Sequence, residues 1–284
     1  MLGATLAAAA QPAASNDDLQ GLSDEFGDEK SLANWKQFHE AEGWRSMIKS
    51  IDVNKTTAGS LTLEPSVAGW FEEYQGAYIF KEVTGNFFVS ARVKTRGRET
   101  EMPTMLWSLA GLMVRAPRPD STKDKWQPRG ENWLFFTTGV ADPVTQPVFE
   151  SKTTGNSKSN LKLRPAKTGW VELGIARVRS AFILVYRFDG ETKWTVHERF
   201  HRRDLPRTLQ VGINAYSGGY THEEQDPFKF NTMQSKNGKA DLVLNVDYMR
   251  FRRLNYEVAS PRSDASELTD YSLTNDELLK KLGL

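Results

Sequence analysis

The chain contains no cysteine among its 284 residues. This absence excludes disulfides, thiolate metal sites and cysteine nucleophiles. It leaves secretion open, because a core of this size does not need disulfides. Long apolar runs are also absent. No segment approaches the roughly 18 consecutive apolar residues of a membrane span, so we expect no membrane-spanning segment.

Neither sign of charge is in excess, since 37 Lys and Arg residues balance 36 Asp and Glu residues for a net charge of +1. Nucleic-acid binding draws its affinity from concentrated positive charge. The composition therefore argues against a nucleic-acid partner. The sequence has no phosphate-binding loop, no dinucleotide fingerprint and no GxSxG elbow. These absences argue against the nucleotide-binding and serine-hydrolase classes that the motifs mark.

Residues 1–20 form an Ala-rich leader, MLGATLAAAAQPAASNDDLQ. An apolar stretch followed by small residues, with Ala-x-Ala spacing at Ala8 to Ala10, is typical of the second half of a signal peptide. The positively charged start of such a peptide is missing. We expect a secreted or periplasmic protein, and the alternative is a disordered leader.

Residues 21–256 are expected to form one domain of nearly continuous strands, rich in β-branched and aromatic residues. The segment from Asp189 to Thr192, DGET, lies between two runs of alternating polarity and predicts a β-hairpin. The pattern predicts an all-β, antiparallel sandwich or barrel. The expected strands are 61–63, 77–82, 86–94, 109–116, 133–138, 161–163, 170–178, 181–188, 195–200, 209–215 and 242–252.

Three polar stretches, 95–106, 117–130 and 218–239, are expected to be long loops. Loops of this length in a compact domain are usually functional or disordered. They are therefore the first places to look for a binding site.

Residues 257–284 form a polar tail that is expected to end in a short helix over 275–282. Thr274 and Glu277 have the spacing of a capping box, and Gly283 suits the helix C-terminus. We expect the leucines at 278, 279 and 282 to dock on the sandwich. The alternative is that this helix is a handle for a protein partner.

Several segments together resemble a known family. They are DEF at Asp24, KEVTGNFFVSARV, GLMVR, ENW, WVELGIARV, FDGETKWTVHERF, LQVGINAYS and the closing DYMRF. Over residues 22–255 this series is similar to the concanavalin A-like lectin/glucanase jelly rolls. It resembles in particular the branch that sits C-terminal to family 43 β-xylosidases, with its bacterial relatives. The resemblance implies a two-sheet antiparallel jelly-roll sandwich, often with sugar on its concave face.

The glucanases of this group use a Glu-x-Asp-x-x-Glu cluster on one strand, and this sequence has none. Its acidic pairs Asp24-Glu25, Glu72-Glu73 and Glu223-Glu224 are adjacent in sequence. Neighbouring strand residues point to opposite faces, so such a pair cannot flank one glycosidic bond. This argues against the glucanase type of site.

Sugar rings stack on aromatic side chains while polar neighbours take the hydroxyls. Arg115 ends GLMVR and could form a forked ion pair with Glu131, or a purely structural salt bridge across strands. The aromatic candidates lie in or beside the long loops. The expected carbohydrate-binding residues are Arg115, Trp133, Tyr216, Tyr220, Trp107 and Trp126.

Four carboxylates are the catalytic candidates if the protein is an enzyme: Glu131, Glu223, Glu224 and Asp226. For the last three the alternative is a solvated loop. No cofactor is expected to be required. The resemblance implies a structural calcium ion that joins the first strand to the last, with Asp24 and Asp247 as its ligands. A turn cap is the alternative role for Asp24.

The sequence therefore favours an exported, lectin-like jelly roll that binds a poly- or oligosaccharide on its concave face. One alternative is a glycoside hydrolase or polysaccharide lyase whose carboxylates come from separate strands and loops. A second alternative is a structural or assembly subunit.

Overall fold

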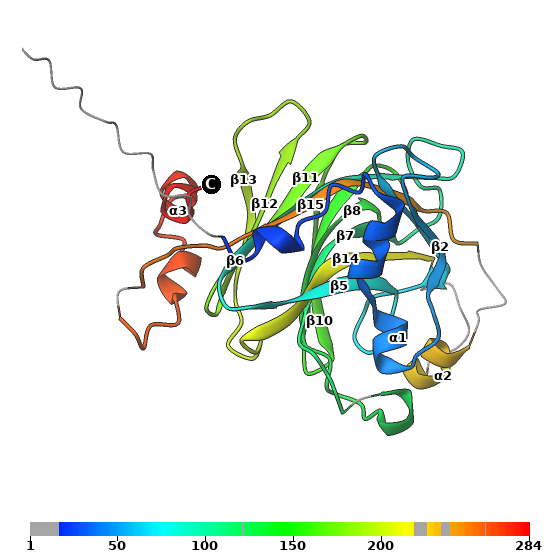
Figure 1. Cartoon of the computed structure of the whole chain (residues 1–284), viewed down its shortest axis with the longest axis horizontal. Coiled ribbons are helices and arrows are strands. Elements are labelled where there is room, and N and C mark those ends of the chain that lie inside the picture. The colour runs from blue at the N-terminus through cyan, green and yellow to red at the C-terminus, as the bar shows by residue number, and fades with distance from the viewer. Residues whose placement is uncertain (1–16, 121, 219–225, 234–238, 259) are drawn as a thin grey trace, which may run out of the picture.

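Two antiparallel sheets packed face to face form the body of the protein in a computed structural model that describes residues 17–120, 122–218, 226–233, 239–258 and 260–284. This arrangement confirms the all-β jelly-roll sandwich (Figure 1). The eight-stranded sheet has the order β1-β5-β14-β7-β8-β9-β10, with β4 paired in parallel to β14. Its strands are β1 (Lys36–Gln37), β4 (Val67–Ala68), β5 (Ala77–Thr84), β7 (Ser108–Arg115), β8 (Trp133–Val140), β9 (Val148–Gly155), β10 (Lys158–Pro165) and β14 (Thr208–Gly218).

The seven-stranded sheet has the order β13-β12-β11-β6-β15-β3-β2. Its strands are β2 (Ile48–Val53), β3 (Leu61–Pro65), β6 (Phe87–Arg96), β11 (Val171–Val178), β12 (Ala181–Phe188), β13 (Thr195–His201) and β15 (Val243–Arg252). β12 and β13 pair across the segment that contains Asp189 and Gly190, so the predicted hairpin is confirmed.

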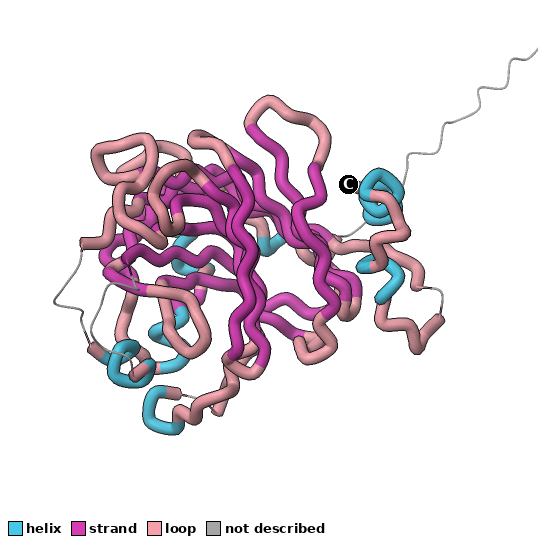
Figure 2. The backbone as a smooth tube through the Cα atoms, turned by 180° about the vertical axis from the view of Figure 1, so that it is seen from behind, coloured by secondary structure: helices cyan, strands magenta, loops and turns pink. Residues whose placement is uncertain are grey.

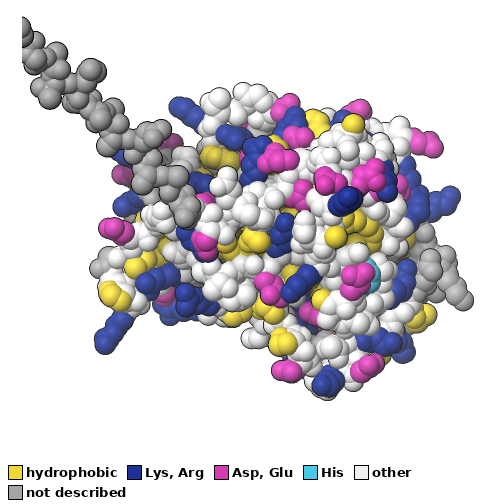
Figure 3. Space-filling model, in the orientation of Figure 1, with side chains coloured by type: hydrophobic (Ala, Val, Ile, Leu, Met, Phe, Trp, Pro, Cys, Tyr) yellow, Lys and Arg dark blue, Asp and Glu magenta, His cyan; other side chains and the backbone are white. Residues whose placement is uncertain are grey.

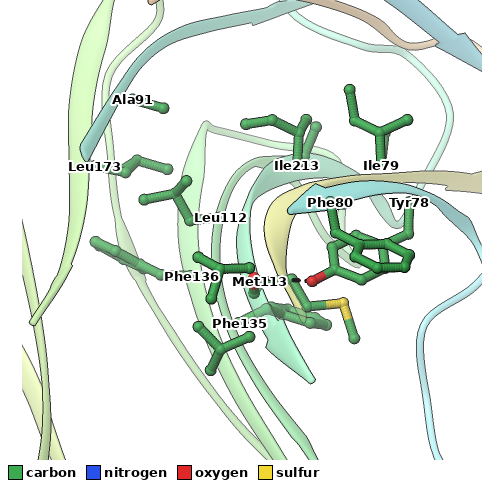
Figure 4. Close-up of a cluster of buried hydrophobic side chains, with 14 of the residues drawn as sticks. Tyr78, Ile79, Phe80, Ala91, Leu112, Met113, Phe135, Phe136, Leu173 and Ile213 are labelled. Atoms are coloured by element: carbon green, nitrogen blue, oxygen red, sulfur yellow. Dashed lines mark hydrogen bonds between the residues drawn. The ribbon is translucent and has the colours of Figure 1, made fainter. Parts of the chain in front are cut away.

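The main core lies between the two sheets, because alternate side chains of every central strand point inward. On β6 the inward set is Phe87, Val89, Ala91 and Val93, as the alternation in the sequence predicts, and none of these four is exposed. Figure 4 shows Leu112, Phe136 and Ile213 of the larger sheet facing Ala91 and Leu173 of the smaller one.

Each expected strand coincides with an observed one to within a few residues at its ends. The sequence reading missed β2 and β9, and also the two-residue strands β1 and β4. β9 reads VFESKTTG, and its charged residues at 150 and 152 are fully buried on the outer face of the sheet. Buried charges remove the apolar–polar alternation by which a strand is recognised.

The helices are short and lie outside the sheets (Figure 2). The α-helices are α1 (Phe38–Glu42), α2 (Pro227–Thr232) and α3 (Asn275–Leu282), and the 3₁₀ helices are η1 (Gln20–Leu22), η2 (Glu29–Asn34), η3 (Lys123–Lys125) and η4 (Ser266–Thr269). The segment 218–239, expected to be a loop, therefore contains the helix α2. α1 and α2 lie at one end of the molecule and α3 at the opposite end (Figures 1 and 2).

The C-terminal helix is confirmed over the predicted residues. Thr274 and Glu277 form the reciprocal capping box, and Gly283 adopts the left-handed conformation at the C-cap. Leu278 and Leu282 are buried in a second apolar cluster, with Ile183 and Val185 on the outer face of the seven-stranded sheet. The apolar side of α3 is thus occupied by the chain itself.

No helix among the described residues is long and apolar enough to cross a membrane. On the face shown in Figure 3, basic and acidic side chains are interspersed. Most of the predicted leader, residues 1–16, lies outside the described residues.

Candidate functional site

The outer face of the eight-stranded sheet is unusual because it is both polar and buried. We call it the covered face. Its side chains are Tyr78, Phe80, Met113, Arg115, Trp133, Phe135, Glu150, Lys152, Gln210, Asn214 and Tyr216, and each is at most 5% exposed. Figure 4 shows Tyr78, Phe80, Met113 and Phe135 on the side of the sheet opposite to Leu112 and Ile213, with the Tyr78 hydroxyl donating to the Met113 carbonyl.

The N-terminal part of the chain supplies the first cover. The ring of Phe38, on α1, lies 5.7 Å from the ring of Trp70 and 6.4 Å from that of Tyr78. Trp70 in turn meets Trp133 of β8 edge-to-face at 6.0 Å. Residues 38–44 and the segment that contains Trp70 therefore fill the space above β5, β7 and β8.

A second cover comes from loop 117–130 and α2. The ring of Trp44 lies 6.4 Å from that of Trp126 and 5.8 Å from that of Phe228. Asn231 of α2 donates to the carbonyl of Glu73 and accepts from the backbone N–H of Gln75. The N-terminal part of the chain, loop 117–130 and α2 are far apart in sequence and are thus held together over one sheet face.

Arg115, at the end of β7, is the centre of the first polar cluster. Its Nε and Nη2 donate to the two carboxylate oxygens of Glu131 at 2.8 Å each, which is the predicted forked pair. Nη2 also donates to Glu42 Oε2 at 3.1 Å, and Nη1 donates to Gln210 Oε1 at 2.9 Å. The guanidinium carbon lies 4.6 Å from the ring centre of Phe38. Arg115 is 0% exposed, so all of these contacts are desolvated.

The two carboxylates that share Arg115 have opposite pKa shifts. Burial alone would raise the pKa of Glu131, but the ion pairs with Arg115 and Arg118 outweigh it and hold that pKa below its ordinary value. For Glu42 burial outweighs the attraction of Arg115 and raises the pKa. Glu131 is therefore the more firmly ionised of the pair.

A second charged cluster lies further along the same face, on β9 and β14. Lys152 Nζ is 2.8 Å from Glu150 Oε1 and donates to the carbonyl of Trp70 at 2.8 Å. The hydroxyl of Tyr216 contacts the other oxygen of Glu150. Burial lowers the pKa of Lys152. Its ammonium is 5.1–5.9 Å from the ring centres of Phe135, Tyr216, Phe71 and Trp107.

Unpartnered hydrogen-bonding groups concentrate at this face. Among the described residues twelve buried side-chain N or O atoms lack a hydrogen-bond partner, and eight of them lie on or over the covered face. Two of the eight, Glu73 Oε2 and Glu150 Oε1, have an arginine or lysine as ion-pair partner, so six have no partner. Both amide atoms of Asn214 belong to this group, and Asn214 is 0% exposed. The others are Trp44 Nε1, Gln75 Nε2, Trp126 Nε1 and Trp133 Nε1. Each such group costs about 1–3 kcal/mol, so their clustering calls for an explanation.

The sequence reading placed Arg115, Trp133 and Tyr216 in one binding site. The structure does bring them to one sheet face, but all three are 0% exposed. The expectation of an open trough is therefore wrong for this conformation, because Phe38, Trp70 and their neighbours occupy the trough. In this state a ligand cannot touch those three side chains.

Trp107 and Trp126 are half-buried at the margin of the covered face. Trp107 lies beside Lys152, and Trp126 lies beside Trp44. Tyr220, the remaining aromatic candidate, lies outside the described residues.

The predicted catalytic carboxylates do not form one described cluster. Glu131 is held by two arginines. Asp226 is the N-cap of α2 and accepts from the backbone N–H of Lys229. Glu223 and Glu224 lie outside the described residues.

The predicted calcium ligands have protein partners. Asp24 accepts from the backbone N–H of Phe26, as a turn cap does, and from Trp35 Nε1. Asp247 forms an ion pair with Arg92 at 2.9 Å. Within the described ranges no group of three or more His, Cys, Asp and Glu side chains is arranged to hold a metal ion.

Glu42, Glu150, Lys152 and Asn214 were missed by the sequence reading. Glu42 lies on a five-residue helix before the first long strand, and its partner Arg115 is 73 residues away. Asn214 stands in LQVGINAYS, where it reads as an ordinary outward polar residue of a half-buried strand. The only usable signal was the charged pair within β9.

No protein-family model matches the chain, and no curated protein sequence matches it. Comparison with solved structures does find matches. A functionally unknown protein from Saccharomyces cerevisiae is similar over 74% of this chain and 95% of that chain, with a TM-score of 0.51 and 15% identity. The GH43 protein BlXynB from Bacillus licheniformis is similar over 81% of this chain, with a TM-score of 0.53 and 12% identity.

The GH43B protein of the Bacteroides ovatus xyloglucan locus is similar over 82% of this chain, with a TM-score of 0.52 and 19% identity. The chain spans only 39% of the length of each of these two GH43 chains. At these identities the likeness shows the fold alone. The jelly-roll fold is shared with parts of these two GH43 proteins.

Proposed function

We propose that the protein binds a carbohydrate at the covered face, after the covering segments move aside. The observation that carries this proposal is the set of six unpartnered buried polar atoms, which lie among stacked aromatic rings. Sugars need both components, since ring faces stack on aromatic side chains and hydroxyls bond to amides, indoles and charged groups. A purely structural face would be expected to be apolar or fully hydrogen-bonded.

Because the covering segments must move before a glycan can bind, the apparent affinity for the glycan is lowered. If only a small fraction of molecules is open, the apparent affinity falls by that fraction. We therefore expect weak or moderate binding and slow association. The half-buried rings of Trp107 and Trp126 at the margin are the first that a glycan would meet.

Isothermal titration with xylo-, gluco- and galacto-oligosaccharides tests the proposal. We expect saturable heat with at least one of these series. Asn214→Leu should abolish that heat while leaving stability unchanged or raised by about 1–3 kcal/mol, because it removes two unpartnered polar atoms. Trp170→Phe, at the residue before β11 of the other sheet, is the control and should bind normally. Absence of heat with every glycan, or full binding by Asn214→Leu, would overturn the proposal.

A glycoside hydrolase is the second candidate, and the pair Glu42 and Glu131 favours it. Both carboxylates contact Arg115, and their pKa values shift in opposite directions. A carboxyl group with a raised pKa beside one with a lowered pKa is the combination that glycoside hydrolysis uses. On this hypothesis Glu42 is the proton donor. A reducing-sugar assay should then show activity that Glu42→Gln removes without loss of glycan binding.

A further inference from the structure

A pocket of about 890 Å³ lies at the end of the sandwich, away from the residues of the covered face. Four segments line it together with Asp18: residues 84–86, residues 177–180, Arg207 and residues 253–255. The first two are the turns between β5 and β6 and between β11 and β12. The volume is in the range of small-molecule sites, about 300–1,000 Å³.

The pocket contains a buried arginine that has no carboxylate partner among the described residues. Arg177 is 4% exposed, and within those residues its guanidinium donates only to backbone carbonyls, those of Arg179, Pro206 and Arg207. Burial lowers its pKa to about 10. A buried charge is normally paired, because neutral dipoles compensate it incompletely. An anion in the pocket would supply the missing counter-charge.

Counting charges around the pocket leaves a positive excess. Four arginines line it, and Asp18 is the only acid among the lining residues. Asp18 forms an ion pair with Arg253, whose Nε and Nη2 donate to the two carboxylate oxygens of Asp18. The neighbouring Asp17 accepts from the backbone N–H of Arg253. Even with both acids counted, four positive charges face two negative ones.

Two of the arginines have donors to spare. Arg179 uses Nη1 to bind the carbonyls of Pro261 and Ser263, and no hydrogen bond involves its Nε or Nη2 within the described chain. The guanidinium of Arg207 is exposed and forms no hydrogen bond or ion pair with any described residue. Neither arginine forms a salt bridge in the part of the chain that the structure describes. Guanidinium forks of this kind match phosphate and sulfate oxygens.

We propose that this arginine pocket binds a phosphate or sulfate anion, either free or as a group on a larger molecule. A neutral sugar would leave the excess charge unpaired, whereas such an anion meets Arg177 at the base and Arg179 and Arg207 at the rim. The site is independent of the covered face, with which it shares no lining residue. Its failure would therefore leave the proposed glycan site untouched.

Thermal unfolding and calorimetric titration of the full chain with sodium phosphate and sodium sulfate test the pocket, with sodium chloride at matched ionic strength as reference. We expect saturable stabilisation by phosphate or sulfate beyond that of chloride. Arg207→Glu should weaken binding about tenfold or more, since it replaces a donor by a repelling charge. The side chain of Arg207 is exposed and forms no hydrogen bond or ion pair with a described residue, so this variant should fold normally.

Lys193→Glu is the matched control, because it makes the same change of charge at an exposed position outside the pocket. It should bind the anion like the unaltered protein. Equal weakening by both substitutions would mean nonspecific screening and would overturn the proposal. No difference between phosphate, sulfate and chloride would overturn it too. Tighter binding of glucose 6-phosphate or glucose 6-sulfate than of the inorganic ions would identify a group on a larger molecule.

Discussion

At the scale of single residues, the ion pairs of Arg115 decide how the covered face holds together. A buried ion pair adds little net stability, but removal of one partner leaves the other charge uncompensated. Glu131 pairs with both Arg115 and Arg118, and it is 1% exposed. Glu131→Gln should therefore lower the free energy of unfolding by about 3–5 kcal/mol, as measured by urea denaturation.

Glu42→Gln is the matched comparison, since it removes the other carboxylate of the same cluster. Burial already disfavours the charged form of Glu42, and Arg115 keeps Glu131 in this variant. We expect a loss below about 2 kcal/mol. If Glu42→Gln cost as much as Glu131→Gln, the assignment of Glu131 as the principal counter-ion would be wrong.

A second residue with a measurable signature is His197, on β13. It is 3% exposed, and its ring lies 4.5 Å from the ring of Phe136. Burial lowers its pKa to about 4. Its contribution to stability is therefore complete above the ordinary pKa of about 6.5 and is lost as the pH falls toward the folded-state value. Between pH values of about 7 and about 4.5 the loss should be about 2.5 kcal/mol.

Urea unfolding of the protein and of His197→Phe at both pH values measures this contribution. Carboxylates also respond to acid, so the quantity that matters is the difference between the two proteins. The stability of His197→Phe should fall less by about that amount. Parallel pH profiles would mean that folding does not lower the pKa of His197.

At the scale of elements, strands whose residues alternate in polarity could be predicted from the sequence. A strand that buries polar residues could not. β6 and β11 were found because their inward residues are apolar. β9 was missed because Glu150 and Lys152 are buried on it. Likewise the meeting of Arg115 with Glu131 follows from the pairing of neighbouring strands, whereas their burial depends on α1, which is distant in sequence. A strand face that is buried by a segment distant in sequence shows no periodic pattern from which that burial could be predicted.

The helix α3 gives a local prediction with an internal control. Leu278 is 0% exposed against the outer face of the seven-stranded sheet, while Leu279 is only partly buried. Leu278→Ala should cost about 2–5 kcal/mol and Leu279→Ala under about 1 kcal/mol. Thermal denaturation would show the difference, and equal shifts would mean that the helix is not docked as described.

The same helix bears on the hypothesis of an assembly subunit. Its apolar side packs on Ile183 and Val185, so a partner would have to displace it. Size-exclusion chromatography of a chain truncated after Ser260 separates the two roles. An unchanged elution state would exclude assembly through the tail.

At the scale of the whole molecule, both sheets are covered on their outer faces, but by different kinds of contact. The tail packs on the smaller sheet with leucines, in an apolar cluster. The larger sheet is covered over charges and unpartnered amide and indole groups. Opening the cover of the larger sheet would lose the aromatic contacts of Phe38, Trp44 and Trp70, but it would let the buried polar groups beneath gain partners. The proposed glycan binding requires this cover to open.

Hydrogen–deuterium exchange of the whole chain tests this asymmetry. In the free protein, amides of residues 38–47 and 69–76 should exchange faster than those of the flanking strands β5, β7 and β8 and faster than those of α3. A glycan that binds at the covered face should change exchange in these two segments and leave α3 unaffected. Binding accompanied by protection only around Arg207 would place the ligand in the arginine pocket instead. Uniformly slow exchange over the covering segments would contradict opening, and with it the route by which a sugar reaches Asn214.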